Sequence, residues 1–187
     1  MKYVSVDIET TGLNTQVHDV LEVGAIFEDT NNPLPRGWCP TFHAYIWKPQ
    51  YVGEPVALMM NHRILKRICE LKKDNDTQLL MTEETFGTRF ADFLTQYGDG
   101  QPIVVAGKNV QTFDLPFLRR LKGWEHIKVR RRIVDPTVMF MNWHSDVEPP
   151  DLATCKKRAG LPELVTHEAL DDAWDVIELN RTKYDKH

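Results

Sequence analysis

The first residues of the chain alternate between apolar and polar side chains. Residues 4–9 read Val-Ser-Val-Asp-Ile-Glu, which is the two-residue period of a β-strand. Residues 20–27 and 41–47 are two further apolar stretches of strand length, separated by a segment rich in Asn, Pro and Gly. The loop at 14–19 allows the first two strands to pair antiparallel. The pattern therefore predicts a meander of three strands at the start of the chain.

From residue 60 onward the apolar positions recur every three or four residues, which is the spacing of one helix face. One such set is Met60, Ile64, Ile68 and Leu71. A second set is Phe86, Phe90, Phe93 and Tyr97. Thr82 is the expected N-cap of the second helix, because glutamates follow it in the first turn, and residues 98–100 are expected to end that helix.

The later elements alternate between strand and helix. They are a strand at 102–107, a helix at 115–121 that stops near Gly123, a short fifth strand at 133–134, a helix from Asp151 to Gly160 and a final helix at 167–182. A meander followed by such an alternation predicts an α/β fold, with a mixed five-stranded sheet and helices on both of its faces. The length favours a single domain over residues 1–187.

Composition places the chain among soluble globular proteins. Its 187 residues are 42% hydrophobic and 27% charged, which is ordinary for that class. Neither a membrane anchor nor a signal peptide is expected, because no apolar run is long enough to span a bilayer and the N-terminus enters a strand directly. The 3 cysteines have no Cys-x-x-Cys pairing, which favours reduced thiols in a cytoplasmic protein and argues against a zinc site.

The formal net charge of −4 is unusual for a protein that handles nucleic acid. A site built from four metal-binding carboxylates would account for the whole excess, and two divalent ions would neutralise it. Such a protein is expected to hold nucleic acid over a few phosphates and not through a broad basic surface.

Asp7 and Glu9 are the first candidates for chemistry. They lie two residues apart on the first strand, so both carboxylates leave the same face. Two acids on one face of an otherwise apolar strand repel each other and resist burial, and a hard divalent cation between them would remove the repulsion. The alternative is a strand end at which both acids face water, and the spacing alone does not decide.

Asp114 is the second candidate. It follows the strand at 102–107 through a polar loop and stands at the start of a helix. In open α/β sheets, ligands collect at the carboxyl ends of the strands, where this loop is expected to lie. The alternative is that Asp114 only caps the helix, with Pro116 in the first turn, and for the isolated segment that is the simpler interpretation.

His167 and Asp172 form the third candidate pair. Residues five apart on a helix differ in direction by roughly 140°, so the two cannot share one helix face. They can share a site if His167 lies on the loop before the final helix and Asp172 lies on its first full turn. Asp171 would then turn toward solvent. The alternative is an exposed helix start whose acids suit the helix dipole.

Three motifs thus follow one another along the chain. They are Asp-x-Glu-Thr-Thr-Gly-Leu from Asp7, Phe-Asp-Leu-Pro-Phe-Leu around Asp114, and His167 with an Asp five residues later. In this order they strongly resemble the DEDDh (DnaQ-like) 3′→5′ exonucleases, and the resemblance covers the chain from Asp7 to Asp172. The family's ribonuclease H-like fold agrees with the predicted order of strands.

The resemblance implies roles for five residues. Asp7, Glu9, Asp114 and Asp172 would hold two divalent cations, Mg²⁺ or Mn²⁺, and His167 would be the general base. Hard oxygen ligands select such ions, and a pair of them assists both the attacking and the leaving oxygen of a phosphodiester. The implied activity is the release of nucleoside 5′-monophosphates from single-stranded DNA or RNA, or from frayed 3′ ends.

The second motif departs from the family pattern. Lys108 stands where the family has a histidine, and Asn109 lies five residues before Asp114 instead of four. We interpret this as a one-residue difference in the loop that leaves Asp114 in place and obscures the role of Asn109.

Further contacts with the substrate are implied by the resemblance. The turn from Thr10 to Leu13 would meet the 3′-terminal nucleotide, with its backbone near the sugar and Leu13 against the base. His62 lies where relatives often contact the terminal residues, although it is equally compatible with a surface position. The basic stretch at 119–132 is either a nucleic-acid track or, as we favour, a solvated surface. Asp135 is expected to be a cap outside the site.

A rival hypothesis is a binding module that keeps the fold and holds nucleic acid or a partner protein without cutting. The presence of all five catalytic-type residues favours the enzyme. The sequence does not distinguish DNA from RNA, and it decides neither a homodimer nor a polymerase partner.

Overall fold

The computed structural model describes residues 1–164 and 166–184. Within this part of the chain the strands are β1 (Lys2–Thr10), β2 (Val20–Asp29), β3 (Thr41–Ile46), β4 (Leu80–Met81) and β5 (Val104–Ala106). The α-helices are α1 (Pro55–Met60), α2 (His62–Lys73), α3 (Glu83–Tyr97), α4 (Asp114–Leu118), α5 (Leu152–Ala159) and α6 (Ala169–Tyr184). Two short 3-10 helices, Trp124–His126 and Pro136–Phe140, lie between α4 and α5. None of the described helices is long and apolar enough to cross a membrane.

The strands form one mixed five-stranded sheet in the order β4-β3-β2-β1-β5. β1, β2 and β3 are antiparallel neighbours, which confirms the predicted meander. β5 runs parallel to β1, and β4 runs parallel to β3. β1 therefore has a hydrogen-bonded neighbour on each edge, so the residues on it are fixed from two sides.

The alternation along β1 divides the core between the two faces of the sheet. Val4, Val6 and Ile8 are buried in the cluster that includes α3 and α4. Tyr3 points to the opposite face and is buried in the cluster that α6 completes. Helices therefore cover both faces, and the predicted α/β class is confirmed.

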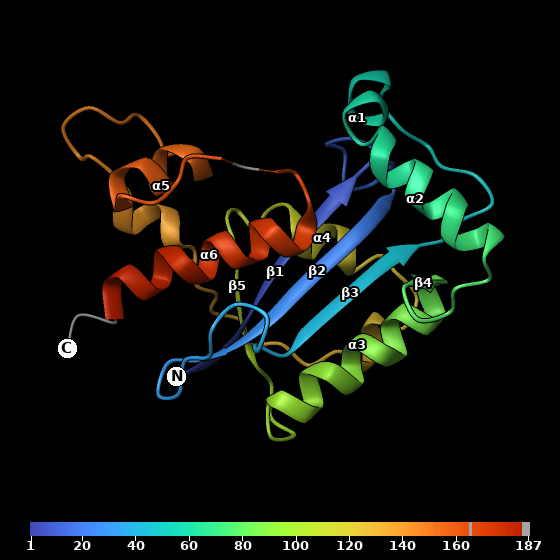
Figure 1. The fold of residues 1–187 in the computed structure, drawn as a ribbon, viewed down its shortest axis with the longest axis horizontal. Coiled ribbons are helices and arrows are strands. Elements are labelled where there is room, and N and C mark those ends of the chain that lie inside the picture. Colours follow the sequence, from blue (N-terminus) through green and yellow to red (C-terminus); the bar gives the residue numbers. More distant parts are fainter. Residues whose placement is uncertain (165, 185–187) are drawn as a thin grey trace.

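The carboxyl end of β1, the helices α1 and α2, and the start of α6 come together at one end of the sheet (Figure 1). Gly24 on β2 allows the approach of α6, because a Cβ at this position would lie 2.4 Å from the backbone carbonyl carbon of Ala169. Any larger residue would push the start of α6 away from the sheet.

Several local predictions are confirmed. Thr82 caps α3 by accepting a hydrogen bond from the N–H of Thr85, and Asp151 caps α5 in the same way through Thr154. Gly160 follows α5 with a left-handed φ of 74°, which is the usual chemistry of a helix end. The 3 cysteines are free.

The first predicted helix face is only partly right. Ile64, Ile68 and Leu71 are buried, but Met60 is 63% exposed. The reason is a break in the helix, because α1 ends at Met60 and α2 begins at His62. The two helices have different axes, so one periodicity cannot extend across both.

Two other helix boundaries also differ. The helix predicted for 115–121 is the shorter α4, and the chain continues from it in tighter turns toward Gly123, whose φ is 86°. The final helix begins at Ala169, which leaves His167 on the preceding loop.

The fifth strand is a different segment from the predicted one. Val134 makes only an isolated bridge to Ala106, because Pro136 has no backbone N–H to continue the pairing and instead begins a 3-10 helix. The remaining strand of the sheet is β4, which pairs with the end of β3. Two residues are too few to show a periodicity, so the sequence pattern could not reveal it.

Candidate functional site

Asp7 and Glu9 lie on the same face of β1, as predicted. Asp7 is opposite Gly24 and Glu9 is opposite Glu22 in the antiparallel register with β2. Both acids are partly buried, and both line a cleft of about 740 Å³ at the end of the sheet. The alternative of two acids at an open strand end therefore does not hold.

Asp114 reaches the same cleft from a different element. It is the first residue of α4 and is 3% exposed. Its Oδ1 accepts a hydrogen bond from the backbone N–H of Ile8 at 3.1 Å, so it is attached directly to β1 between Asp7 and Glu9. Phe113 occupies the N-cap position, and the alternative interpretation of Asp114 as a cap is wrong.

His167 and Asp172 enter the cleft from the start of α6. His167 lies on the preceding loop with a left-handed φ of 54°, and Asp172 lies in the first turn of the helix and is 7% exposed. The ligand atoms of Glu9, His167 and Asp172 all lie within 4.8 Å of one another. Asp171 points away and pairs with Arg36. This is the arrangement under which the spacing of the two residues allowed them to share a site.

Burial and mutual repulsion raise the pKa of all four of these carboxyls. The pKa of Asp7 lies well above its usual value, because burial disfavours the charged form and Asp114 and Asp172 add repulsion. Burial raises the pKa of Glu9 to about 7 and that of Asp114 to about 7. It raises the pKa of Asp172 to about 6, with a further contribution from a neighbouring acid. Without a counter-charge, the site therefore resists full ionisation.

The donor set fits hard divalent cations. Oδ1 of Asp172 is buried and has no hydrogen-bond partner in the described part of the chain, so it has lone pairs free for a ligand. Carboxylate oxygens are the ligands that Mg²⁺ and Mn²⁺ prefer. A bound cation would also return the four acids to their ionised form, because an opposite charge lowers a carboxyl pKa.

The loop between β5 and α4 forms another wall of the cleft. Lys108 is the one Lys or Arg side chain among the described residues that line it. The N–H of Asn109 donates to Oδ2 of Asp135 at 2.8 Å, while Oδ1 of Asp135 accepts from the N–H of Thr137 at 2.9 Å. Asp135 is thus the predicted cap, and it also holds the loop that carries Lys108.

The turn after β1 is fastened to α2. Thr10 is 7% exposed; its hydroxyl donates to the carbonyl of Gly12 at 2.8 Å, and its carbonyl accepts from Nδ2 of Asn61 at 2.9 Å. Thr10 therefore shapes the turn through bonds to the protein. Leu13, at the tip of the turn, is 75% exposed and lines the cleft.

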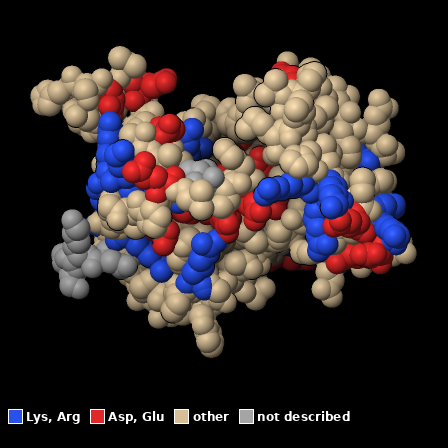
Figure 2. All heavy atoms as spheres, turned by 45° about the horizontal axis from the view of Figure 1, so that its top comes forward, with Lys and Arg blue, Asp and Glu red and all other residues tan. Residues whose placement is uncertain are grey.

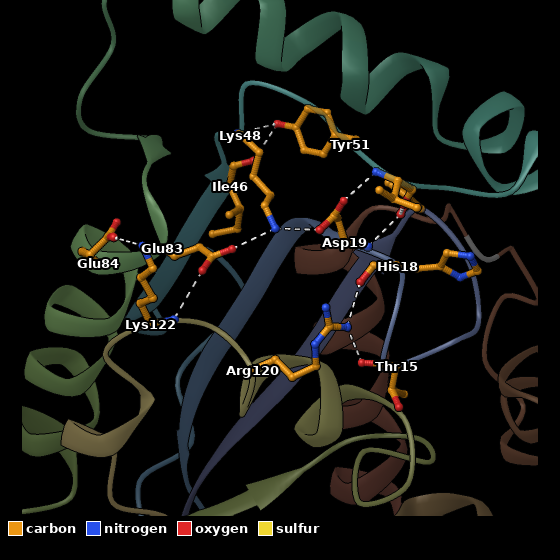
Figure 3. Close-up of polar contacts among 12 residues, drawn as sticks. Thr15, His18, Asp19, Ile46, Lys48, Tyr51, Glu83, Glu84, Arg120 and Lys122 are labelled. Atoms are coloured by element: carbon orange, nitrogen blue, oxygen red, sulfur yellow. Dashed lines mark hydrogen bonds and ion pairs between the residues drawn. The ribbon is translucent and has the colours of Figure 1, made fainter.

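A partly buried ion pair supports the same turn from the side of β3 (Figure 3). Asp19 is 6% exposed and accepts from Nζ of Lys48 and from the N–H of Val52, each at 2.7 Å. Lys48 also pairs with Glu83 at 3.0 Å. The N–H of Asp19 donates to Oγ1 of Thr11 at 2.8 Å. The end of the loop is thereby fixed to the connection between β3 and α1 and to the turn after β1.

Arg120 holds the other part of this loop. Its guanidinium donates to the carbonyl of Thr15, and to that of His18 at 3.1 Å (Figure 3). Arg120 belongs to the basic stretch predicted from the sequence, and this contact gives it a structural role. The exposed Leu13 is thus presented to the cleft by a loop with several anchors.

The sequence matches no known family profile and no curated protein. Its structure, however, is similar to that of exonuclease I from E. coli in a complex with single-stranded DNA, with a TM-score of 0.67 and 19% identity. The match covers 99% of this chain and 41% of that one. The chain shares its fold with exonuclease I.

Two further structures of exonuclease I are also similar to this chain. The E. coli enzyme in complex with a dT13 oligonucleotide has a TM-score of 0.65 at 17% identity, over 99% of this chain and 42% of that one. A product-bound structure of exonuclease I has a TM-score of 0.65 at 18% identity, over 97% and 42%. The chain thus spans about two-fifths of the length of these proteins. The ribonuclease H-like fold implied by the three motifs is confirmed.

His62 does not line the cleft that holds the four acids. It lies beside it, in a groove of about 490 Å³ between the start of α2 and the loop before α6. His167 lines both spaces, so the groove that His62 lines adjoins the cleft at the candidate base.

The basic stretch at 119–132 does not form a track into the cleft. None of its side chains is among the described residues that line it, and Lys122 pairs with Glu84 at 2.8 Å. In Figure 2, where the top of Figure 1 is turned toward the viewer, Lys and Arg side chains are interspersed with Asp and Glu side chains. The position of the stretch outside the cleft and the pairing of Lys122 agree with the favoured interpretation of a solvated surface.

The sequence pattern does not predict the long-range contacts that hold the site together. Asn61, Asp19 and Asp135 are polar side chains whose partners are backbone groups of distant segments. Burial is what distinguishes the first two from other surface-type residues, and burial of a single polar residue has no signature in the sequence pattern.

Proposed function

We propose that this chain is a metal-dependent 3′→5′ exonuclease domain that releases nucleoside 5′-monophosphates from single-stranded nucleic acid or frayed 3′ ends. The supporting observation is the convergence of four acids and a histidine from three separate elements in one cleft, on the fold of exonuclease I. No other cluster of acids in the described residues combines such burial with an orphaned carboxylate oxygen.

The four acids Asp7, Glu9, Asp114 and Asp172 would hold two divalent cations. Such ions, when bound, supply positive charge that stabilises the attacking and leaving oxygens of a phosphodiester. Without them, the carboxylates would repel the phosphate of the substrate. The chain's own contribution is to fix the four acids in advance, through β1, through the bond between Asp114 and Ile8, and through the docking of α6.

His167 would act as the general base. It is exposed at the mouth of the cleft, within 4.8 Å of the nearest oxygens of Glu9 and Asp172, so a water molecule attacking a phosphate held there would lie within its reach. A histidine side chain is the group that most often takes up such a proton in general-base catalysis.

The 3′-terminal nucleotide would lie between Leu13 and His62. Leu13 offers an exposed apolar surface for the base, and His62 lines the adjoining groove. Lys108, on the opposite wall, would contact a backbone phosphate. Because the charged contacts are so few, we expect affinity for the strand to depend on the cations more than on a basic surface.

The test uses single-stranded DNA and RNA of equal sequence, labelled at the 5′ end, with Mn²⁺ or Mg²⁺. DNA is the first substrate to try, since exonuclease I was crystallised with single-stranded DNA. We expect a ladder that shortens one nucleotide at a time from the 3′ end and that EDTA abolishes. The Asp7→Asn variant serves as the control for contaminating nuclease.

Two results would contradict the proposal. Internal fragments at early times would indicate an endonuclease on the same scaffold. Binding of the strand without cleavage, by a wild-type protein whose melting temperature rises with Mn²⁺, would favour the non-catalytic binding module instead.

A further inference from the structure

Glu22 is a buried acid beside the site to which the proposed chemistry gives no role. It lies on β2, directly opposite Glu9 in the register with β1, and it is 2% exposed. A negative charge there is unfavourable for the neighbouring acids. Burial raises the pKa of Glu9, and the repulsion from Glu22 raises it further. Glu22 therefore needs a stabilising partner of its own.

Protein groups engage both carboxylate oxygens of Glu22. Oε1 lies 2.6 Å from Nε2 of His43 on β3, and Oε2 accepts from the backbone N–H of Ala169 at 3.4 Å. Asp172 differs, because its Oδ1 has no partner in the described part of the chain. Glu22 is thus committed to the protein and is not a fifth candidate ligand for a cation.

The N–H that Glu22 accepts belongs to the first residue of α6. The first N–H groups of a helix lack acceptors within the helix and carry partial positive charge, so a buried carboxylate stabilises that end. Ala169 is 0% exposed, so its N–H is shielded from solvent. Gly24, two residues along β2 on the same face, allows the close approach that this contact requires.

This contact lies between the two catalytic-type residues of the helix start. His167 precedes Ala169 on the loop, and Asp172 follows it in the first turn. A displacement of the helix start would move both residues away from Glu9, and a misplacement of about 1 Å can cost about 10²-fold in rate.

We propose that Glu22, itself held by His43, is a positioning residue that docks the start of α6 on β2. It thereby sets the place of His167 and Asp172 relative to the acids of β1. The catalytic consequence rests on the proposed function, whereas the docking contact itself does not.

Glu28 supplies a matched control on the same strand and the same helix. It is 1% exposed, and its carboxylate accepts from Arg181 at 3.0 and 2.7 Å and from the hydroxyl of Tyr184 at 2.6 Å. It therefore ties α6 to β2 as well, but at the end of the helix far from the cleft (Figure 1).

The experiment compares Glu22→Ala, Glu22→Gln and Glu28→Ala in the full chain. We expect Glu22→Ala to lower kcat about 10–100-fold and to raise the Mn²⁺ concentration needed for half of the thermal shift by about 10-fold, as loss of outer support for ligands does elsewhere. KM should change little. Glu22→Gln keeps an acceptor oxygen for Ala169 and should recover most of both losses. Glu28→Ala should lower the melting temperature and leave kcat and the Mn²⁺ midpoint unchanged.

A third measurement needs neither substrate nor metal. In metal-free protein, amide exchange of the peptide at residues 166–172 should become faster in Glu22→Ala and not in Glu28→Ala. If Glu22→Ala does not fold, Glu22→Asp takes its place, because its shorter side chain cannot reach His43 and Ala169 together.

The proposal is overturned if the Glu22 variant matches Glu28→Ala in kcat, in the Mn²⁺ midpoint and in amide exchange. If the wild type cuts no nucleic acid at all, the proposed function fails. The Mn²⁺ midpoint and the amide exchange then still decide whether Glu22 positions α6.

Discussion

The candidate site has two walls that are built in different ways. The strand wall consists of Asp7 and Glu9, which lie on β1, and of Asp114, which accepts a hydrogen bond from β1. The helix wall consists of His167 and Asp172, at the start of α6. β1 has hydrogen-bonded neighbours on both edges, so the strand wall belongs to the sheet itself.

The helix wall has no such backbone ladder. It depends on the docking of α6 against β2, through the contact of Glu22 with Ala169 and the close packing at Gly24. The two walls face each other with their acids close enough to raise one another's pKa. Half of the site is thus determined by strand geometry and half by tertiary packing, so substitutions in the two halves should have different effects.

The largest effect is expected from a change in the strand wall. Asp7→Asn keeps the size of the side chain and removes a carboxylate charge that would bind the cations. We expect kcat to fall at least about 10³-fold, since a divalent ion supplies several kcal/mol to the transition state. In EDTA at pH 8 the same variant should melt at a higher temperature than wild type, because one buried, repelled charge is gone.

Asp146→Asn is the control for this change. Asp146 lies outside the cleft, and its pairing with Arg158 holds the pKa of its carboxyl below the usual value. Its replacement should leave kcat unchanged and should not raise the melting temperature. Cleavage by Asp7→Asn at the wild-type rate would contradict the assignment of the strand wall.

The second-largest effect is expected from a change in the helix wall, His167→Ala. General bases contribute typically about 10²–10⁴-fold, and we expect a loss near the lower end of that range. The Mn²⁺-induced rise in melting temperature should persist, because the four carboxylates remain. Single-turnover rates and thermal shifts of the same samples check both points. A lost thermal shift would mean that His167 is a cation ligand and not the base.

The pH dependence of stability tests the repulsion between the walls. In metal-free protein, Glu9 and Asp114 have a pKa of about 7 and Asp172 one of about 6. These values lie above those of the unfolded chain, which are about 4, so the folded state binds more protons and its stability falls as the pH rises from about 4 to about 7. Urea unfolding in EDTA should show a loss on the order of 2 kcal/mol between pH 5.5 and 8.

Saturating Mn²⁺ should largely remove this loss of stability, because the cations compensate the same charges. A metal-free protein that is equally stable at both pH values would show that the acids do not repel one another across the cleft.

The smallest effect is expected at the loop that presents Leu13. Arg120→Met removes the donor to the carbonyls of Thr15 and His18 and keeps a long apolar side chain. KM should rise by about threefold, which corresponds to roughly 0.7 kcal/mol of uniform binding, and kcat should not change. The neighbouring exposed Arg119 supplies the control, since Arg119→Met should leave both constants unchanged. A fall in kcat for Arg120→Met would mean that the loop also orders the strand wall.

The two walls also differ in how far the sequence predicts them. The pairing of Asp7 with Glu9 follows from the two-residue period of a strand, which is a local property. The placement of His167 before α6 follows from helix geometry once the helix is assumed. Asp114 was ambiguous, because a cap and a ligand occupy the same position at a helix start. Its bond to Ile8, 106 positions away, resolves the ambiguity, and no local pattern contains it.

The remaining errors have the same origin. Met60 follows the helical spacing, yet it is exposed because a break at Asn61 changes the helix axis. β4 exists only because it pairs with β3. The docking role of Glu22 depends on a helix that begins 147 positions later. These features arise from tertiary contacts, which a periodicity cannot express.

The two walls together are expected to hold a pair of divalent cations. Calorimetric titration of the metal-free wild type with Mn²⁺ at pH 8 tests it most directly. We predict binding of two ions per chain, as a two-metal site requires, and the loss of at least one of them in Asp7→Asn. Absence of binding by the wild type, or unchanged binding by Asp7→Asn, would contradict the account.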